Sequence, residues 1–149
     1  MVNSKKNKKM VDFGFQAVPA SEKEKLVNEV FNDVADKYDL MNDLSSFGLH
    51  RLWKKQAVKL MNLSLGDVVL DVASGTGDMA YSISKKIGTS GSIIVSDINN
   101  KMLLNGRDRL LDKGVDSFAI NCSAESLPFK DSTFDKVSIA FGLRNITKK

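Results

Sequence analysis

The chain has few of the residues that build cross-linked or metal-held scaffolds. Its 149 residues include one cysteine, Cys122, one histidine and two prolines. A single cysteine cannot form a disulfide framework, and one cysteine with one histidine does not make a structural metal site. Proteins without disulfides are typical of reducing compartments. We therefore expect a cytoplasmic protein that holds no metal ion.

Long apolar runs are also absent. No stretch approaches the ~20 apolar residues that span a bilayer, and the start MVNSKKNKKMVDFGF lacks the apolar block of a secretory signal. Hydrophobic residues make up 42% of the chain and charged residues 27%, which is typical of a globular domain and excludes fibrous or disordered classes. About 150 residues is also the length of one ordinary domain.

The net charge of +4 comes from one end of the chain. Four lysines lie in the first ten residues without an acid, and the remaining 18 basic and 18 acidic side chains balance. Because acidic and basic side chains are equal in number over residues 11–149, the composition does not predict a basic surface that would bind nucleic acid. We expect residues 1–20 to form a Lys-rich flexible tail, which could contact an anionic membrane surface peripherally.

Residues 21–62 carry helical patterns and no strand pattern. Ser21 and Glu24 form a capping box, which predicts a helix start. Two apolar stripes at helical spacing follow, so two N-terminal helices are predicted as a lid or substrate region. The stripes comprise Val27, Val30, Phe31, Val34, Tyr38 and Met41, and then Leu49, Leu52, Trp53, Ala57, Leu60 and Met61. We expect Trp53 and Met61 to face the core.

Residues 63–149 change to alternating short strands and helices. Apolar runs at 67–73, 92–97, 117–122 and 134–141 predict strands, and helical patterns lie at 77–87 and 99–113. Strands that alternate with helices of this length predict βαβ units and a parallel sheet. The predicted fold class is α/β, doubly wound.

A glycine-rich turn follows the first predicted strand, over residues 71–78, DVASGTGD. Gly75 and Gly77 permit a tight turn and the close approach of a ligand. Twenty residues beyond Gly77, Asp97 ends the second strand, where a carboxylate can accept hydrogen bonds from both ribose hydroxyls. Together they predict a site for an adenosine-containing ligand at the carboxyl edge of the sheet.

The glycine turn alone leaves two cofactor classes open. Residues 75–80, GTGDMA, also fit the G-x-G-x-x-A pattern of nicotinamide dinucleotide sites, which would make the chain an oxidoreductase. The run 123–129, SAESLPF, favours the other class, because a loop of this kind after the third strand covers adenine in S-adenosylmethionine (SAM) methyltransferases. With TFD at 133–135, these segments resemble class I SAM-dependent methyltransferases. That resemblance implies a Rossmann-like sheet with about four of its seven strands present.

Three further runs narrow the resemblance. The segments FNDVADKYDLMND at 31–43, SFGLHRLWK at 46–54 and FGLRN at 141–145 are similar to the ubiquinone/menaquinone biosynthesis C-methyltransferases, the UbiE family. The resemblance covers about residues 12–147. It implies methyl transfer from SAM to a ring carbon of a prenylated quinol, which yields menaquinol or a methylated ubiquinol precursor.

The resemblance also implies which residues act. The expected SAM-binding positions are Asp71, Gly75, Thr76, Gly77, Asp97, Ser123 and Ala124. Arg144 and Asn145 follow the fourth strand, where a guanidinium could stabilise the developing oxyanion of the quinol and an amide could orient its hydroxyl. The reaction needs positioning and a dry site rather than a covalent nucleophile or a metal ion.

The length departs from the family, whose members continue for roughly another hundred residues. We therefore expect a truncated or split enzyme that is inactive by itself, or a non-catalytic fragment that needs a missing C-terminal half. We expect the fourth strand to present an open edge with Val137, Ile139 and Phe141, and the isolated chain to aggregate or form a homo-oligomer through it.

Overall fold

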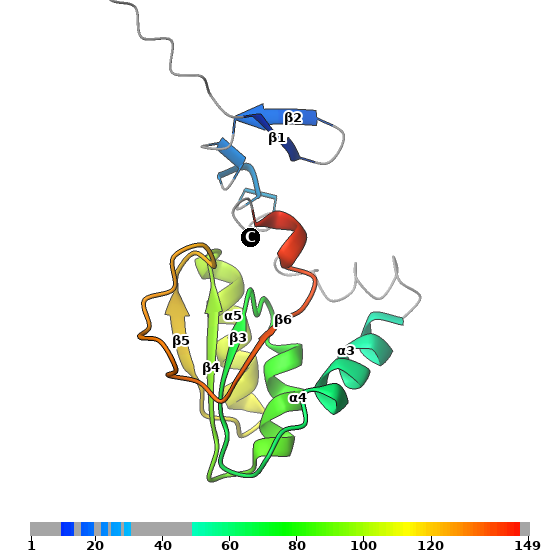
Figure 1. Cartoon of the computed structure of the whole chain (residues 1–149), viewed down its shortest axis with the longest axis vertical. Helices are drawn as coiled ribbons and strands as arrows, with labels where there is room; N and C mark the ends of the chain where they lie inside the picture. Colours follow the sequence, from blue (N-terminus) through cyan, green and yellow to red (C-terminus); the bar gives the residue numbers. More distant parts are fainter. Residues whose placement is uncertain are drawn as a thin grey trace, which may run out of the picture.

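A four-stranded parallel sheet forms the centre of the protein (Figure 1). The computed structural model describes residues 10–13, 16–19, 22–23, 25–27, 29–30 and 49–146. The sheet has the order β5-β4-β3-β6. Its strands are β3 (Val68–Val72), β4 (Ser92–Asp97), β5 (Phe118–Asn121) and β6 (Lys136–Ile139). All four were predicted, with ends within two residues of those expected, and the α/β parallel class is confirmed.

The helices α4 (Asp78–Ile87) and α5 (Asn100–Asp112) make the crossovers between β3 and β4 and between β4 and β5. Every pairing in the sheet is parallel: β3 pairs with β4 on one side and with β6 on the other, and β4 pairs with β5. Within the described ranges β6 pairs with no strand other than β3, so it lies at one edge of the sheet, as expected.

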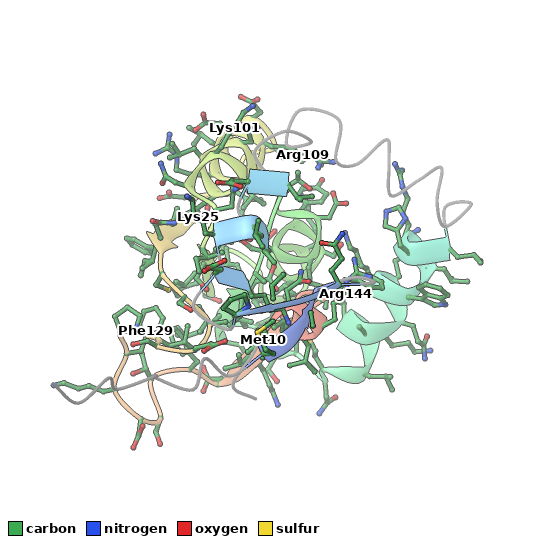
Figure 2. The ribbon with its side chains drawn as sticks, turned by 90° about the horizontal axis from the view of Figure 1, so that it is seen from above. Met10, Lys25, Lys101, Arg109, Phe129 and Arg144 are labelled. Carbon is green, nitrogen blue, oxygen red and sulfur yellow. The ribbon has the colours of Figure 1, made fainter. Side chains whose placement is uncertain are left out.

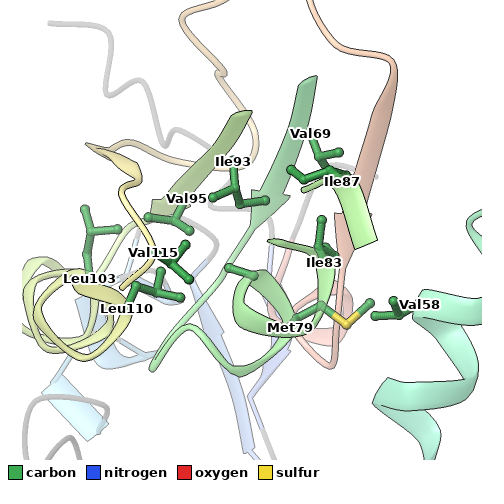
Figure 3. Close-up of a cluster of buried hydrophobic side chains, with 11 residues drawn as sticks. Val58, Val69, Met79, Ile83, Ile87, Ile93, Val95, Leu103, Leu110 and Val115 are labelled. Atoms are coloured by element: carbon green, nitrogen blue, oxygen red, sulfur yellow. The ribbon is translucent and has the colours of Figure 1, made fainter. Parts of the chain in front are cut away.

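The main core lies between the sheet and these helices. Figure 3 shows Val69, Ile93 and Val95 of the strands pointing toward the helices, where Ile83 and Leu110 meet them. Side chains on one face of a parallel strand alternate with those on the other, so these positions define the helix-covered face. The helical spacing of the apolar residues in α4 and α5 is therefore explained by this face.

On the opposite face of the sheet, a loop is what packs among the described residues. Leu70, Val72 and Ile94 form a second buried cluster there. Phe129 and Phe134 of the β5–β6 connection pack on it and meet each other edge to face, with ring centroids 4.8 Å apart. An edge-to-face pair of this kind adds to the stabilisation from buried area. The packing of these two rings contributes to the almost complete burial of Leu70.

The region before the sheet differs from expectation in two respects. Residues 10–13 and 16–19, which we predicted to be part of a flexible tail, form two antiparallel strands, β1 (Met10–Phe13) and β2 (Gln16–Pro19). Helix α3 (Leu49–Leu60) is present, but Trp53 is 54% exposed instead of facing the core, whereas Met61 packs against the main core.

The structure describes only part of the region to which the remaining N-terminal predictions apply. Residues 22–23, 25–27 and 29–30 are helical, in agreement with the predicted start of the first helix. The rest of that helix, at 31–41, and the four lysines of the predicted tail lie outside the described residues. Among the helices that are described, none is long and apolar enough to cross a membrane.

Candidate functional site

The candidate residues gather at one edge of the sheet because parallel strands end on the same side. In Figure 1 the arrows of the central sheet point toward the end where the red C-terminal segment lies. The glycine turn follows β3, Asp97 ends β4, Ser123 follows β5 and Arg144 follows β6. Four segments that are far apart in the sequence therefore meet at the carboxyl edge, where open α/β sheets bind ligands. Figure 2 looks down on this end, with Arg144 and Phe129 labelled.

The glycine turn has the tight geometry that was predicted. Gly75 has φ 54° and Gly77 has φ 77°, both in the left-handed region that favours glycine. The Gly77 amide donates to the Ser74 carbonyl at 3.0 Å, and Gly77 caps the start of α4. The Ser74 amide donates to the Ser96 carbonyl at 3.0 Å, which ties the turn to β4.

Asp97 holds the turn from the neighbouring strand. Its Oδ2 accepts a hydrogen bond from the Gly75 amide at 2.9 Å, and its Oδ1 accepts one from the Asn99 amide at 2.9 Å. Burial raises the pKa of Asp97, while the amides of Asn99 and Gly75 act in the opposite direction. Each carboxylate oxygen can accept more than one hydrogen bond, so Asp97 can still accept from the hydroxyls of a ligand.

Asp71 lies beneath the turn and is 1% exposed. Its Oδ1 accepts a 2.6 Å hydrogen bond from the Ser138 hydroxyl of β6, and its Oδ2 has no partner among the described atoms. Burial raises the pKa of Asp71 to about 7, against the lowering effects of the Ser138 hydrogen bond and the Lys54 charge. Through the hydrogen bond from Ser138, Asp71 connects β3 to β6 directly before the glycine turn.

The segment after β5 is placed beside Asp97. Asn121 pairs with Asp97 in the sheet register, and its side-chain amide donates to the Asp97 and Ile98 carbonyls at 2.9 and 3.0 Å. The hydroxyl of Ser123 accepts from the Glu125 amide at 3.3 Å, and Ala124 packs on the second core cluster. The predicted pair Ser123 and Ala124 therefore starts a turn at the same edge as Asp97.

The segment after β6 approaches the glycine turn closely. A Cβ added to Gly142 would lie 2.5 Å from the Cβ of Ala73, so a larger residue there would push the two segments apart. A short 3₁₀ helix, η2 (Leu143–Asn145), follows, and the Asn145 amide donates to the Gly142 carbonyl at 2.9 Å. Arg144 is exposed on η2. The structure thus brings Arg144 and Asn145 to the edge that carries the glycine turn.

Sequence reasoning missed two residues that shape the site. Asn99 is buried and caps α5, since its Oδ1 accepts from the Met102 amide at 2.8 Å. Gly106 lies in the middle of α5, where a Cβ would be 2.4 Å from the Gly75 carbonyl oxygen. Both had a signal: an asparagine before a helical run is a common N-cap, and a glycine inside a helix has a packing reason in many proteins.

A group of charges next to the turn was also missed. Asp78, the first residue of α4, accepts from the Nζ of Lys54 in α3 at 3.2 Å and pairs with Nη2 of Arg109 in α5 at 3.0 Å. Burial acts to raise the pKa of Asp78, but Lys54 and Arg109 together lower it. Nη1 of Arg109 donates to the Thr76 carbonyl at 3.4 Å. No sequence signal links these three residues, because they come from three helices.

Within the described ranges no group of three or more histidine, cysteine or acidic side chains could hold a metal ion. Cys122 is half-buried, and burial raises the pKa of its thiol, which disfavours a reactive thiolate. In the part of the chain that is described, the edge carries carboxylates, backbone amides and the Arg144 guanidinium, with the Arg109 guanidinium beside the turn.

The comparisons of this chain with family models and with curated proteins agree on one family. The model of the ubiE/COQ5 methyltransferase family matches residues 19–149. The chain is 52% identical over 95% of its length to a ubiquinone/menaquinone biosynthesis C-methyltransferase UbiE of Cellvibrio japonicus, covering 58% of that protein. It is 55% identical over 92% of its length to the protein of the same name from Pseudomonas paraeruginosa, covering 54% of it. The chain thus spans little more than half the length of these relatives.

A shorter relative is covered more fully. A UbiE protein of Ectopseudomonas oleovorans is 53% identical over 92% of this chain, which covers 82% of that protein. Among solved structures, a SAM-dependent methyltransferase from Aquifex aeolicus superposes with a TM-score of 0.59 at 23% identity, covering 64% of this chain and 51% of the other. At that identity the similarity concerns the fold, and it agrees with the Rossmann-like arrangement described above.

Proposed function

Because the chain belongs to the ubiE/COQ5 methyltransferase family, we propose that it forms the SAM-binding part of a C-methyltransferase that acts on a prenylated quinol in quinone biosynthesis. The observation that carries the proposal is the coupling of the glycine turn to a partly buried carboxylate, with Gly75 donating to Asp97 at 2.9 Å. An adenosine ribose bound at this edge would find a tight turn and a hydrogen-bond acceptor held together.

The residues at the edge fit SAM. Asp97 would accept from the ribose hydroxyls, while Gly75, Thr76 and Gly77 would lie against the ligand without a bulky side chain at either glycine. A Cβ on Gly75 would lie 3.4 Å from the methyl group of Met102, so this side of the turn already contacts α5. Ser123 and Ala124 would border the adenine from the segment after β5. Asp71 would support the turn from below.

When bound, SAM supplies an electrophilic methyl group. The chain's own residues position the acceptor and stabilise its charge. Arg144 would hold the quinol oxygen as it becomes negative, and Asn145 would orient the hydroxyl. A guanidinium suits this role because it stays charged and offers several donors in one plane. No nucleophile of the chain is needed, which agrees with the half-buried thiol of Cys122.

The substrate determines where such an enzyme works. A prenyl chain partitions into the bilayer, so we propose a cytoplasmic protein that contacts the inner face of the membrane peripherally. A nucleic-acid partner is not part of this proposal. The quinol and a further polypeptide segment or a second copy of the chain are the proposed partners.

The test is ligand binding by calorimetry, with S-adenosylhomocysteine and NAD compared on the same preparation. We expect S-adenosylhomocysteine to bind more tightly. Asp97→Ala should weaken it by about 10- to 150-fold, since hydrogen bonds to a charged group contribute about 1.5–3 kcal/mol. Asp116→Ala, which changes an exposed acid outside the edge, is the matched control. Tighter binding of NAD, or equal affinity in the Asp97 variant, would contradict the proposal.

A methyl-transfer assay tests the chemistry separately. Radiolabelled SAM and a short-chain demethylmenaquinol should give labelled menaquinol when the further segment or second copy proposed above is supplied and the binding site and Arg144 are intact. Arg144→Lys keeps the charge and loses the planar set of donors, so it should lower the turnover and leave the affinity for S-adenosylhomocysteine unchanged. A turnover unaffected by this change would remove Arg144 from the mechanism.

A further inference from the structure

Helix α3 carries two solvent-facing stripes in addition to the side that packs on the core. Figures 1 and 2 both show α3 at the margin of the molecule, beside α4. Its inward side holds the buried His50 and Val58 and the ion-paired Lys54. A helix that rests on its protein through one side leaves the rest of its surface for solvent or a partner.

The first outward stripe is apolar. Its members recur at helical spacing, and large side chains on it are 48–75% exposed: Leu49, Leu52, Trp53 and Leu60. Trp53 also meets the half-exposed Phe141 beyond β6, with ring centroids 6.2 Å apart, and Leu143 of η2 is 50% exposed. Contiguous exposed apolar side chains are uncommon on soluble monomers and mark interaction surfaces.

The second outward stripe is basic. Lys55 and Lys59 are exposed one turn apart, so they lie on one side of the helix beside the apolar stripe. The helix sequence LHRLWKKQAVKL contains no acidic residue. An apolar stripe with tryptophan next to a basic stripe is the pattern of helices that lie in the plane of an anionic bilayer surface.

We propose that this α3 face, made of Leu49, Leu52, Trp53, Lys55, Lys59 and Leu60, docks the protein on an anionic lipid surface. The apolar side chains would enter the interface, and the lysines would meet the lipid phosphates. The proposal deepens the proposed function, because a prenylated substrate resides in the bilayer. Charge complementarity favours an anionic lipid surface as the partner of this face. If a second copy of the chain bound there instead, Lys55 and Lys59 of the two copies would repel each other.

The chain offers its own reporter, because Trp53 is its one tryptophan. The full 149-residue chain should be mixed with vesicles of phosphatidylcholine alone or with added phosphatidylglycerol. We expect binding to the anionic vesicles only, a blue shift of the tryptophan emission, and quenching by brominated lipids. Co-sedimentation without quenching would place the contact elsewhere on the chain and overturn the proposal, as would absence of binding.

Two variants and two matched controls identify the face. Lys55→Glu with Lys59→Glu should weaken vesicle partitioning by about 25-fold or more, since each lysine near anionic lipid contributes about fivefold. Leu60→Gln should weaken it by about tenfold. The controls make the same changes elsewhere: Lys86→Glu with Lys130→Glu, and Leu111→Gln, which is 64% exposed on α5. Equal losses in variants and controls would refute the assignment of this face.

Two further readouts separate the outcomes. S-adenosylhomocysteine affinity, measured without vesicles, should be the same in the α3 variants and the wild type. Failure of the vesicle test would therefore leave the proposed function intact. Failure of the ligand-binding test would likewise leave the membrane proposal to be judged by the vesicle data. Sedimentation without vesicles should show no change in association state between the wild type and Leu60→Gln. A loss of dimers in that variant would assign the face to a second copy and overturn the proposal.

Discussion

Gly106→Ala tests how α5 supports the glycine turn. The new Cβ would lie 2.4 Å from the Gly75 carbonyl oxygen and 3.2 and 3.3 Å from backbone atoms of Thr76 and Gly77. All three contacts are with backbone, so none can be relieved by the rotation of a flexible side chain. Either α5 or the turn must move by about an ångström to reach ordinary van der Waals separation.

Two effects oppose each other in this variant. Alanine improves the intrinsic stability of a helix interior by about 1 kcal/mol relative to glycine. Overpacking against a rigid neighbour costs about 1–3 kcal/mol, and here the neighbour is a turn held by Asp97 and by α4. We expect the second effect to dominate, with a net loss of unfolding free energy of up to about 2 kcal/mol. Because Gly75 would shift relative to Asp97, ligand affinity should also fall.

The assay is urea unfolding followed by circular dichroism, together with calorimetry using S-adenosylhomocysteine. Asn105→Ala, at the exposed neighbouring position of α5, is the matched control because it changes helix propensity without touching the turn. It should raise the stability by a few tenths of a kcal/mol and leave the affinity unchanged. If Gly106→Ala were as stable as Asn105→Ala and bound the ligand normally, the close approach of α5 to the turn would not matter, and the reasoning would be refuted.

Two other predictions concern Asp71 and the edge strand. Burial raises the pKa of Asp71 from 3.8 to about 7, so the folded chain keeps a proton that the unfolded chain releases, and the stability from this group should fall by about 4 kcal/mol as the pH rises from 3.8 to 7. Urea unfolding across this range should show a flatter profile for Asp71→Asn, and identical slopes would contradict the buried position. Val137, 58% exposed on the edge strand β6, should promote self-association, which Val137→Lys should reduce in sedimentation velocity. A wild-type chain that stays monomeric at every concentration would contradict this.

Local rules were sufficient for much of the fold and for the geometry of part of the candidate site. The strands β3, β4, β5 and β6 and the helices between them follow from apolar periodicity, which is a property of neighbouring residues. The left-handed turn at Gly75 and Gly77 was predictable because few other residues adopt that backbone conformation readily. The position of Asp97 beside the turn was predictable because the end of its strand and its spacing from the turn are visible in the sequence.

Only the tertiary structure decided what depends on distant residues meeting. The pKa of Asp71 follows from its burial under the turn and from a hydrogen bond to Ser138, 67 positions away. The orientation of Trp53 was mispredicted, because helical spacing marks a stripe and does not say which stripe meets the core. The close contact of Gly106 with Gly75 likewise needs two helices and a strand in place. Periodicity and turn chemistry are local, whereas burial, charge pairing and close approach arise when the sheet brings separate segments to one edge.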